Sequence, residues 1–103
     1  MNFLQGDTYN LPVSLSDKDG LLDVSLISEV EFMFGNIRKL YPNDVTYDEV
    51  KGVFYIPLSQ QETFSMINNE IECQARVKFN GGSVKGTRII KMRVMDSISK
   101  AVL

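Results

Sequence analysis

The sequence contains no histidine and no tryptophan, and it has a single cysteine among its 103 residues. Without histidine, the chain has no imidazole general base, no Ser-His-Asp triad and none of the nitrogen ligands that most zinc sites use. The lone cysteine, Cys73, has no partner within the chain for a disulfide, so packing must supply the stability. These absences predict a protein that is not an enzyme, with no catalytic residues, no cofactor and no metal ion.

Neither sign of charge is in large excess, because 11 Lys and Arg residues are balanced by 13 Asp and Glu residues. The net charge of −2 predicts no general attraction to nucleic acid or to an anionic membrane. No apolar run approaches the roughly 20 residues of a membrane-spanning helix, and residues 1–7 lack the basic and apolar regions of a signal peptide. With 44% hydrophobic content, residues 1–103 are expected to form one domain with its own core.

The longest patterned stretch, residues 70–95, predicts two β-strands joined at Asn80-Gly81-Gly82. On the first strand, apolar and polar residues alternate strictly, which places all the apolar side chains on one face. These apolar residues are Ile71, Cys73, Ala75, Val77 and Phe79. The second strand, residues 83–95, is the longest apolar-rich run in the sequence. The pair therefore predicts a sheet with one buried face.

A two-residue loop at Asn80-Gly81 would set the register of this hairpin. The expected pairs are Val77–Val84, Ala75–Gly86, Cys73–Arg88 and Ile71–Ile90. Arg88 does not suit a buried face, so we expect a β-bulge near Thr87 that turns it away. The pair of small residues leaves a hollow, which Phe32 or Phe54 from a facing sheet is expected to fill.

Other parts of the chain have the composition of short strands. Alternating runs at residues 9–15, 30–34 and 53–58 predict three strands, and weaker patterns at 37–41 and 45–50 predict two more. With about seven to eight strands separated by turn residues, the sequence indicates an all-β fold, an antiparallel sandwich or small barrel.

Three local signals add detail to this arrangement. Pro12 has no backbone donor, so the first of these strands should lie at a sheet edge or carry a bulge. Residues 21–27 are expected to contain a short strand or a single turn. Ser59-Gln60-Gln61-Glu62 has the form of a capping box, which predicts one short helix of two turns at most.

Two motifs that could bind ions are incomplete. Asp17-Lys18-Asp19-Gly20 is similar to the start of a calcium loop, but Leu21 and Ser28 stand where further ligands are needed. An ordinary turn is therefore favoured. The glycines Gly81, Gly82 and Gly86 do not make a phosphate loop, because no Lys-Ser or Lys-Thr follows them.

Two further candidates for catalytic residues, an acidic cluster and the cysteine, also have simpler explanations. Asp44, Asp48 and Glu49 lie near tyrosines, but their loop spacing does not establish the two facing carboxylates of a glycosidase. Solvated surface charge is the favoured interpretation. Cys73 falls on the apolar face of its strand, so it is expected to be buried and unreactive.

Six basic residues without an intervening acid mark the predicted hairpin. They are Arg76, Lys78, Lys85, Arg88, Lys91 and Arg93. The outer face of the hairpin is therefore expected to be locally positive, either as a solvated surface that resists edge-to-edge pairing or as a docking surface for an acidic partner. Apolar residues at outward positions and at the two ends, including residues 1–4, extend this candidate interface through Met95, Ile98 and Leu103.

Several of these features together resemble a known kind of domain. They are Gln5-Gly6-Asp7-Thr8-Tyr9 before an alternating strand, the turn Asp17-Lys18-Asp19-Gly20, the Gly-Gly turn of the hairpin and the closing Val94-Met95-Asp96-Ser97-Ile98-Ser99. The pattern resembles the small immunoglobulin-like domains of tailed-phage virion proteins. The best match is the N-terminal domain of baseplate upper proteins from phages and prophages of Gram-positive bacteria.

The resemblance implies an immunoglobulin-like β-sandwich that is a structural subunit of a phage or prophage virion, in the tail or baseplate. Its partners would be other virion proteins or copies of itself, and assembly would take place in the bacterial host cytoplasm. Baseplate upper proteins carry further domains, whereas this sequence ends at Leu103, so a capsid decoration or adaptor protein is an alternative. A second alternative is a carbohydrate-binding module that stacks sugars on Tyr41, Tyr47 and Tyr55. No feature indicates a small-molecule ligand.

Overall fold

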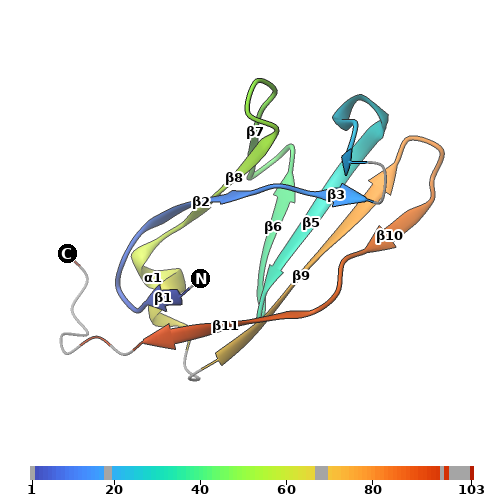
Figure 1. Ribbon diagram of the computed structural model, residues 1–103. Helices are drawn as coiled ribbons and strands as arrows, with labels where there is room; N and C mark the ends of the chain where they lie inside the picture. Colours follow the sequence, from blue (N-terminus) through green and yellow to red (C-terminus); the bar gives the residue numbers. More distant parts are fainter. Residues whose placement is uncertain (1, 18–19, 67–69, 96, 98–102) are drawn as a thin grey trace.

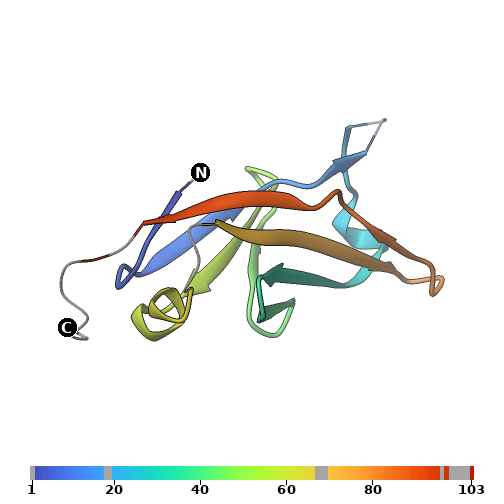
Figure 2. The same ribbon diagram turned by 90° about the horizontal axis from the view of Figure 1, so that it is seen from below.

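The computed structural model describes residues 2–17, 20–66, 70–95, 97 and 103, and it shows an all-β protein with one short α-helix (Figures 1 and 2). The strands are β1 (Asn2–Leu4), β2 (Tyr9–Val13), β3 (Ser16–Asp17), β4 (Gly20–Leu21), β5 (Ile27–Phe34), β6 (Ile37–Tyr41), β7 (Thr46–Asp48), β8 (Val53–Leu58), β9 (Glu70–Phe79), β10 (Val84–Gly86) and β11 (Ile90–Met95). The α-helix α1 spans Gln60–Phe64, and a 3-10 turn, η1, spans Val24–Leu26. None of the helices described is long and apolar enough to cross a membrane.

The strands form two main sheets and one small hairpin. The large sheet has the order β1-β11-β9-β5-β6, with β10 beside β9, the small sheet has the order β2-β8-β7, and β3 pairs only with β4. The prediction of an all-β fold is confirmed. The expected number of seven to eight strands is too low, because the described residues form eleven strands. The expectation that all strands are antiparallel is also wrong, because β1 runs parallel to β11.

The two main sheets face each other across one hydrophobic core. Phe32 of β5 and Phe54 of β8 meet between the sheets, with their ring centroids 5.5 Å apart. On β9, every second residue from Ile71 to Val77 is buried and Phe79 is partly buried, as the alternation of the sequence predicts. The core therefore collects the inward residues of both sheets, which are Leu11, Val30, Phe32, Phe34, Phe54, Ile56, Leu58, Ile71, Cys73, Ala75, Val77 and Val94, with Phe3, Leu15, Ile27, Val45 and Met66 from shorter segments.

The N-terminal segment belongs to this core. Phe3 is 0% exposed, and its ring makes edge contacts with Tyr9 at 5.3 Å and Phe34 at 6.0 Å. The expectation that the apolar N-terminal end takes part in an interface is therefore wrong for Phe3. The short strand β1 buries it within the same chain by extending the large sheet beyond β11.

Two local predictions are confirmed. Pro12 lies on β2, which is an edge strand of the small sheet, so the ladder with β8 is not interrupted by its missing donor. Ser59 caps α1, and its hydroxyl accepts a hydrogen bond from the Glu62 amide while the Glu62 carboxylate accepts one from the Ser59 amide. This reciprocal pair is the capping box that the sequence predicts.

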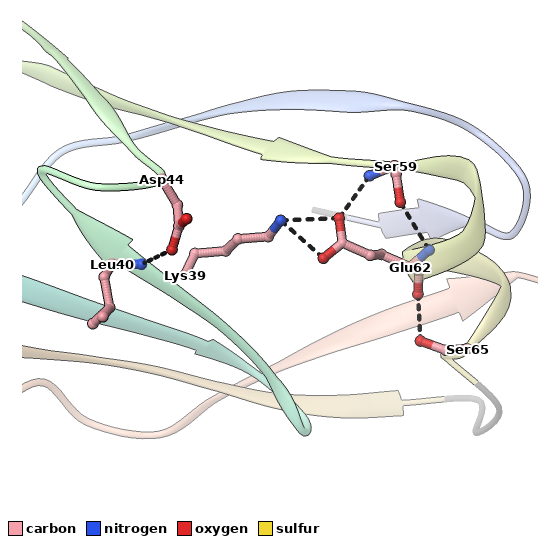
Figure 3. Close-up of polar contacts among 6 residues, drawn as sticks. All are labelled: Lys39, Leu40, Asp44, Ser59, Glu62 and Ser65. Carbon is pink, nitrogen blue, oxygen red and sulfur yellow. Dashed lines mark hydrogen bonds and ion pairs between the residues drawn. The ribbon is translucent and has the colours of Figure 1, made fainter.

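The capping box is tied to the edge of the large sheet by an ion pair. The Lys39 ammonium of β6 lies 2.8 Å from the Glu62 carboxylate, and the same carboxylate holds the Ser59 amide (Figure 3). Burial raises the pKa of Glu62, but the hydrogen bonds from Lys39 and Ser59 and the charge of Lys39 outweigh it and lower the pKa. One carboxylate therefore connects the helix cap to β6.

The hairpin between β9 and β10 differs from the sequence prediction. The Phe79 amide donates to the Ser83 carbonyl at 2.9 Å, which leaves a three-residue loop, Asn80-Gly81-Gly82. Gly82 has a φ of +95°, a conformation that glycine adopts without steric cost, as three-residue hairpin loops require. The predicted two-residue loop is therefore wrong. The observed pairs are Val84–Lys78, Lys85–Val77, Gly86–Arg76, Ile90–Cys73 and Met92–Ile71.

The predicted bulge near Thr87 is present, and it divides the return strand into β10 and β11. The Thr87 amide donates to the Ala75 carbonyl at 2.8 Å, and the Thr87 hydroxyl accepts from the Ala75 amide at 3.0 Å. The Thr87 carbonyl instead accepts from the Gln74 side chain at 2.9 Å. A side-chain hydroxyl thus replaces one backbone acceptor of the ladder, and the chain gains an extra residue there.

We predict that Thr87→Val destabilises the fold, because the partly buried Ala75 amide loses its acceptor while the volume is conserved. The expected loss in the free energy of unfolding is about 1–2 kcal/mol, measured by urea denaturation. Thr87→Ser keeps the hydroxyl and should lose less than half of that amount. Equal losses in both variants would show that the hydroxyl does not hold the bulge.

We predict that Glu62→Gln lowers the free energy of unfolding by about 1 kcal/mol at neutral pH, because glutamine preserves the capping box but not the charge that faces Lys39. The folded-state pKa of Glu62 lies below its ordinary value of 4.5, so the carboxylate stabilises the fold above that pH. Its contribution is lost as the pH falls through the lower, folded-state pKa. The difference between wild type and variant should therefore disappear in acid, and a constant difference would contradict this ion pair.

Candidate binding groove

A groove of about 880 Å³ opens between the two main sheets, on the side formed by β2 of the small sheet and by β10 and β11 of the large sheet. One wall comes from β2 and the segment that follows it, including Leu11 and Leu15. The other comes from β10, the bulge and β11, including Ile90 and Met92. In the view of Figure 1, the ribbon of β2 runs above that of β11.

The bottom of the groove is apolar and belongs to the core. Phe32 lies directly opposite Ala75 in the ladder between β5 and β9, and both residues line the groove. The pairing of the small residues differs from the predicted one, because Gly86 pairs with Arg76 and not with Ala75. The three-residue hairpin loop is the reason that Gly86 does not pair with Ala75, because this loop shifts the pairing of β10 with β9 by one residue. The prediction for Phe32 is also wrong, because Phe32 lies on β5 of the same sheet as Ala75 and not on a facing sheet, and the space beside Ala75 is part of the open groove.

The rim of the groove exposes large apolar side chains. Ile89 is 57% exposed and Ile90 is 60% exposed, and both line the opening. The pair follows the bulge, where the strict alternation of inward and outward residues is interrupted. Ile90 is exposed although it lies opposite buried Cys73, and the sequence pattern did not predict this exposure.

Most basic residues of the candidate interface lie opposite acids on the outer face of the large sheet. Across the ladders of β5, β9 and β11, the opposed pairs are Glu29–Lys78, Glu31–Arg76, Glu72–Lys91 and Glu70–Arg93. Glu31 also accepts from Arg38 of β6 at 2.6 Å. The expectation of a locally positive outer face is therefore wrong, because neighbouring strands supply glutamates that the one-strand pattern could not place.

Lys85 and Arg88 are the two bases of this set that lie opposite no acid. Lys85 pairs with buried Val77, so it stands on the groove side of the sheet, and Arg88 lies in the bulge. Both residues line the groove, and they are the charged residues among those described as lining it. The positive charge of the hairpin that no acid opposes therefore lies at the groove.

The apolar residues of the candidate interface are placed separately. Met95 ends β11 and is 48% exposed, and Leu103 is exposed at the C-terminal end. Ile98 lies outside the described residues. Neither Met95 nor Leu103 is among the residues that line the groove.

The backbone of the groove rim forms an open strand edge. The order of the large sheet places no described strand beyond β10 or beyond the first half of β11, because β1 pairs only with Arg93 through Met95. Within the described part of the chain, no hydrogen bond engages the amides of Arg88 and Ile89. Such an edge can accept a further strand.

Cys73 is buried beneath this edge. Its side chain faces the core, and its Sγ atom lies 3.2 Å from the Sδ atom of Met92. Burial raises the pKa of the Cys73 thiol to about 11. A thiol in this environment is a poor nucleophile, which agrees with the expectation from its place on the apolar face.

We predict that iodoacetamide modifies Cys73 at pH 8 on the order of a hundredfold more slowly in the folded protein than in urea, because both the raised pKa and burial reduce the accessible thiolate. Mass spectrometry of the alkylated product measures the two rates. A rate that does not change on unfolding would show that the thiol is accessible in the fold.

The acidic residues near the tyrosines support turns. The Asp44 carboxylate accepts from the Leu40 amide at 2.9 Å (Figure 3). The Asp48 carboxylate accepts from the Val50 and Lys51 amides at 2.9 and 3.1 Å. These contacts stabilise the loops on either side of β7, and they do not arrange two carboxylates across a cleft.

The three tyrosines considered for sugar stacking do not share a face. The rings of Tyr41 and Tyr47 pack against Phe54, with centroid distances of 5.1 and 4.7 Å. Tyr55 follows Phe54 along β8, so its side chain points to the opposite face of the small sheet. Tyr41 and Tyr47 do line a second hollow, of about 460 Å³, together with Asp23 and Glu49.

The residues considered for calcium lie in the β3–β4 hairpin, where Asp17 pairs with Gly20, while Lys18 and Asp19 lie outside the described residues. In the part of the chain that the structure describes, no group of three or more potential metal ligands comes together.

No protein-family model matches this chain, and no similar protein was found among curated proteins or among solved structures. The structure therefore defines the class, an all-β protein with two facing sheets and an open groove between them. The groove residues on β2 and β11 were not predicted from the sequence. The doubled isoleucine at residues 89–90, which breaks the alternation of the return strand, was the available signal.

Proposed function

We propose that this protein is a non-enzymatic structural subunit of a phage or prophage virion, in the tail or baseplate, and that it acts through protein–protein contacts. The observation that carries the proposal is the open strand edge from Val84 to Met92, which borders an apolar groove. The phage setting is supported by the resemblance of the turn and strand pattern to immunoglobulin-like virion domains. On this proposal, the two sheets are an immunoglobulin-like sandwich to which β1 and the β3–β4 hairpin are added.

The surface chemistry of the edge favours binding over simple solvation. Isolated exposed apolar residues are common on soluble proteins, but Ile89 and Ile90 adjoin each other and an apolar groove. Edge strands of monomeric proteins are usually protected by strand pairing, by charge or by a covering segment. Here charge is present but the groove beside it stays open, which is typical of a surface that receives a partner.

We predict that the purified chain forms either a defined oligomer or a defined complex when it is mixed with the tail and baseplate proteins of a phage that encodes it. Size-exclusion chromatography with light scattering across a concentration series measures both. Many weak contacts in a symmetric assembly would add up to a stable particle. A chain that stays monomeric at high concentration and binds no virion protein would contradict the proposal.

A second candidate function is glycan binding at the hollow that Tyr41 and Tyr47 line. Two aromatic rings beside the carboxylates of Asp23 and Glu49 are a suitable surface for a sugar. Titration with bacterial wall polysaccharide tests this candidate, with Tyr47→Ala as the variant that should lose binding. Absence of binding in the wild type would eliminate it.

A further inference from the structure

We propose that the groove rim from Val84 to Met92 binds an extended, carboxylate-bearing segment of another protein, which adds to the large sheet as a strand. This inference rests on the proposed function, because it names how the subunit would hold a partner. It is carried by three independent properties of the same surface: free backbone groups, an uncovered apolar wall and unopposed positive charge.

The free backbone groups favour an extended occupant. The amides of Arg88 and Ile89 have no hydrogen-bond partner among the described residues, and they lie between two segments, β10 and the first half of β11, whose outer edges are also open. A strand that lies alongside this edge would pair with these groups, as in other cases of strand addition. A compact ligand would leave most of them unpaired.

The apolar wall indicates which side chains the occupant carries. Its groove-facing side chains would cover Ile90 and Met92 on β11 and approach Leu15 on the opposite wall. Removal of such apolar area from water is the main favourable contribution to most protein association. At about 3.3 Å per residue, a segment of roughly five to seven residues spans most of this rim.

The charge determines the polar part of the occupant. Lys85 and Arg88 lie opposite no acid, whereas the other four bases of the hairpin each lie opposite a glutamate. No salt bridge of Lys85 or Arg88 is present within the described residues. A carboxylate at the β10 end of the added strand would meet both charges.

The same charges disfavour a second copy at this edge. Two copies that paired edge to edge would bring Lys85 and Arg88 of both chains close together, and like charges in such pairs are destabilising. The glutamate-rich strands β5 and β9 are central in the sheet and cannot leave it to serve as the added strand. The occupant is therefore a segment of a different protein.

The test uses a synthetic heptapeptide in which valine alternates with glutamate, added to the isotopically labelled full chain. Backbone amide shifts measured by NMR should concentrate at residues 84–92, and the β6 edge at the far side of the sheet should not respond. A matched peptide with lysine in place of glutamate should bind about tenfold more weakly or not at all. Absent shifts at residues 84–92, or equal binding of both peptides, would overturn the proposal.

Charge reversal provides the protein-side control. Lys85→Glu together with Arg88→Glu should weaken binding of the glutamate peptide about tenfold and strengthen binding of the lysine peptide. Lys51→Glu, on the turn between β7 and β8 and not among the lining residues, should leave both affinities unchanged. Concentration-dependent shifts at residues 84–92 without peptide would show that a second copy occupies the edge, which would also overturn the proposal.

Failure of this inference differs from failure of the proposed function. If the wild-type chain joins virion proteins and the Lys85→Glu, Arg88→Glu variant joins them equally well, the subunit role holds and the groove is not the binding surface. If the wild-type chain joins no virion protein, the subunit role fails, whatever the peptide does.

Discussion

The exchange of hydrogen bonds between Ala75 and Thr87 is the interaction on which the proposed binding surface depends. Because the Thr87 hydroxyl takes the place of a backbone acceptor, the return strand of the hairpin gains one residue and changes its register beside β9. The residues that follow, Arg88 and Ile89, leave the ladder. The bulge therefore produces the free amides, exposes the isoleucines and places Arg88 at the groove.

The charges on the outer face of the large sheet are balanced, whereas the charges beside the groove are not. Along β5, β9 and β11, opposed charges meet across neighbouring strands, which keeps the outer face soluble without a strong field of either sign. The positive charge that remains unopposed is confined to Lys85 and Arg88 beside the groove. On our proposal, this unopposed charge gives the groove a preference for acidic partners.

The sequence predicts local features well, but it predicts poorly which strands lie beside one another in the sheets. The alternation on β9, the capping box at Ser59 and the bulge near Thr87 depend on residues close together in the chain, and all three are present. The burial of Phe3 and the glutamates opposite the hairpin bases depend on which strands become neighbours, which local patterns do not encode. The predicted hairpin loop is one residue too short. Asn80-Gly81 suits a two-residue loop, but Gly82 allows a three-residue one.

Hydrogen–deuterium exchange tests the central claim, that the edge from Val84 to Met92 is the surface that binds a partner. In the free protein, the amides of Arg88 and Ile89 should exchange quickly, whereas those of β9 should be protected. In the complex with virion proteins, the account predicts strong protection of Arg88 and Ile89. Unchanged exchange at these two amides in a stable complex would contradict it.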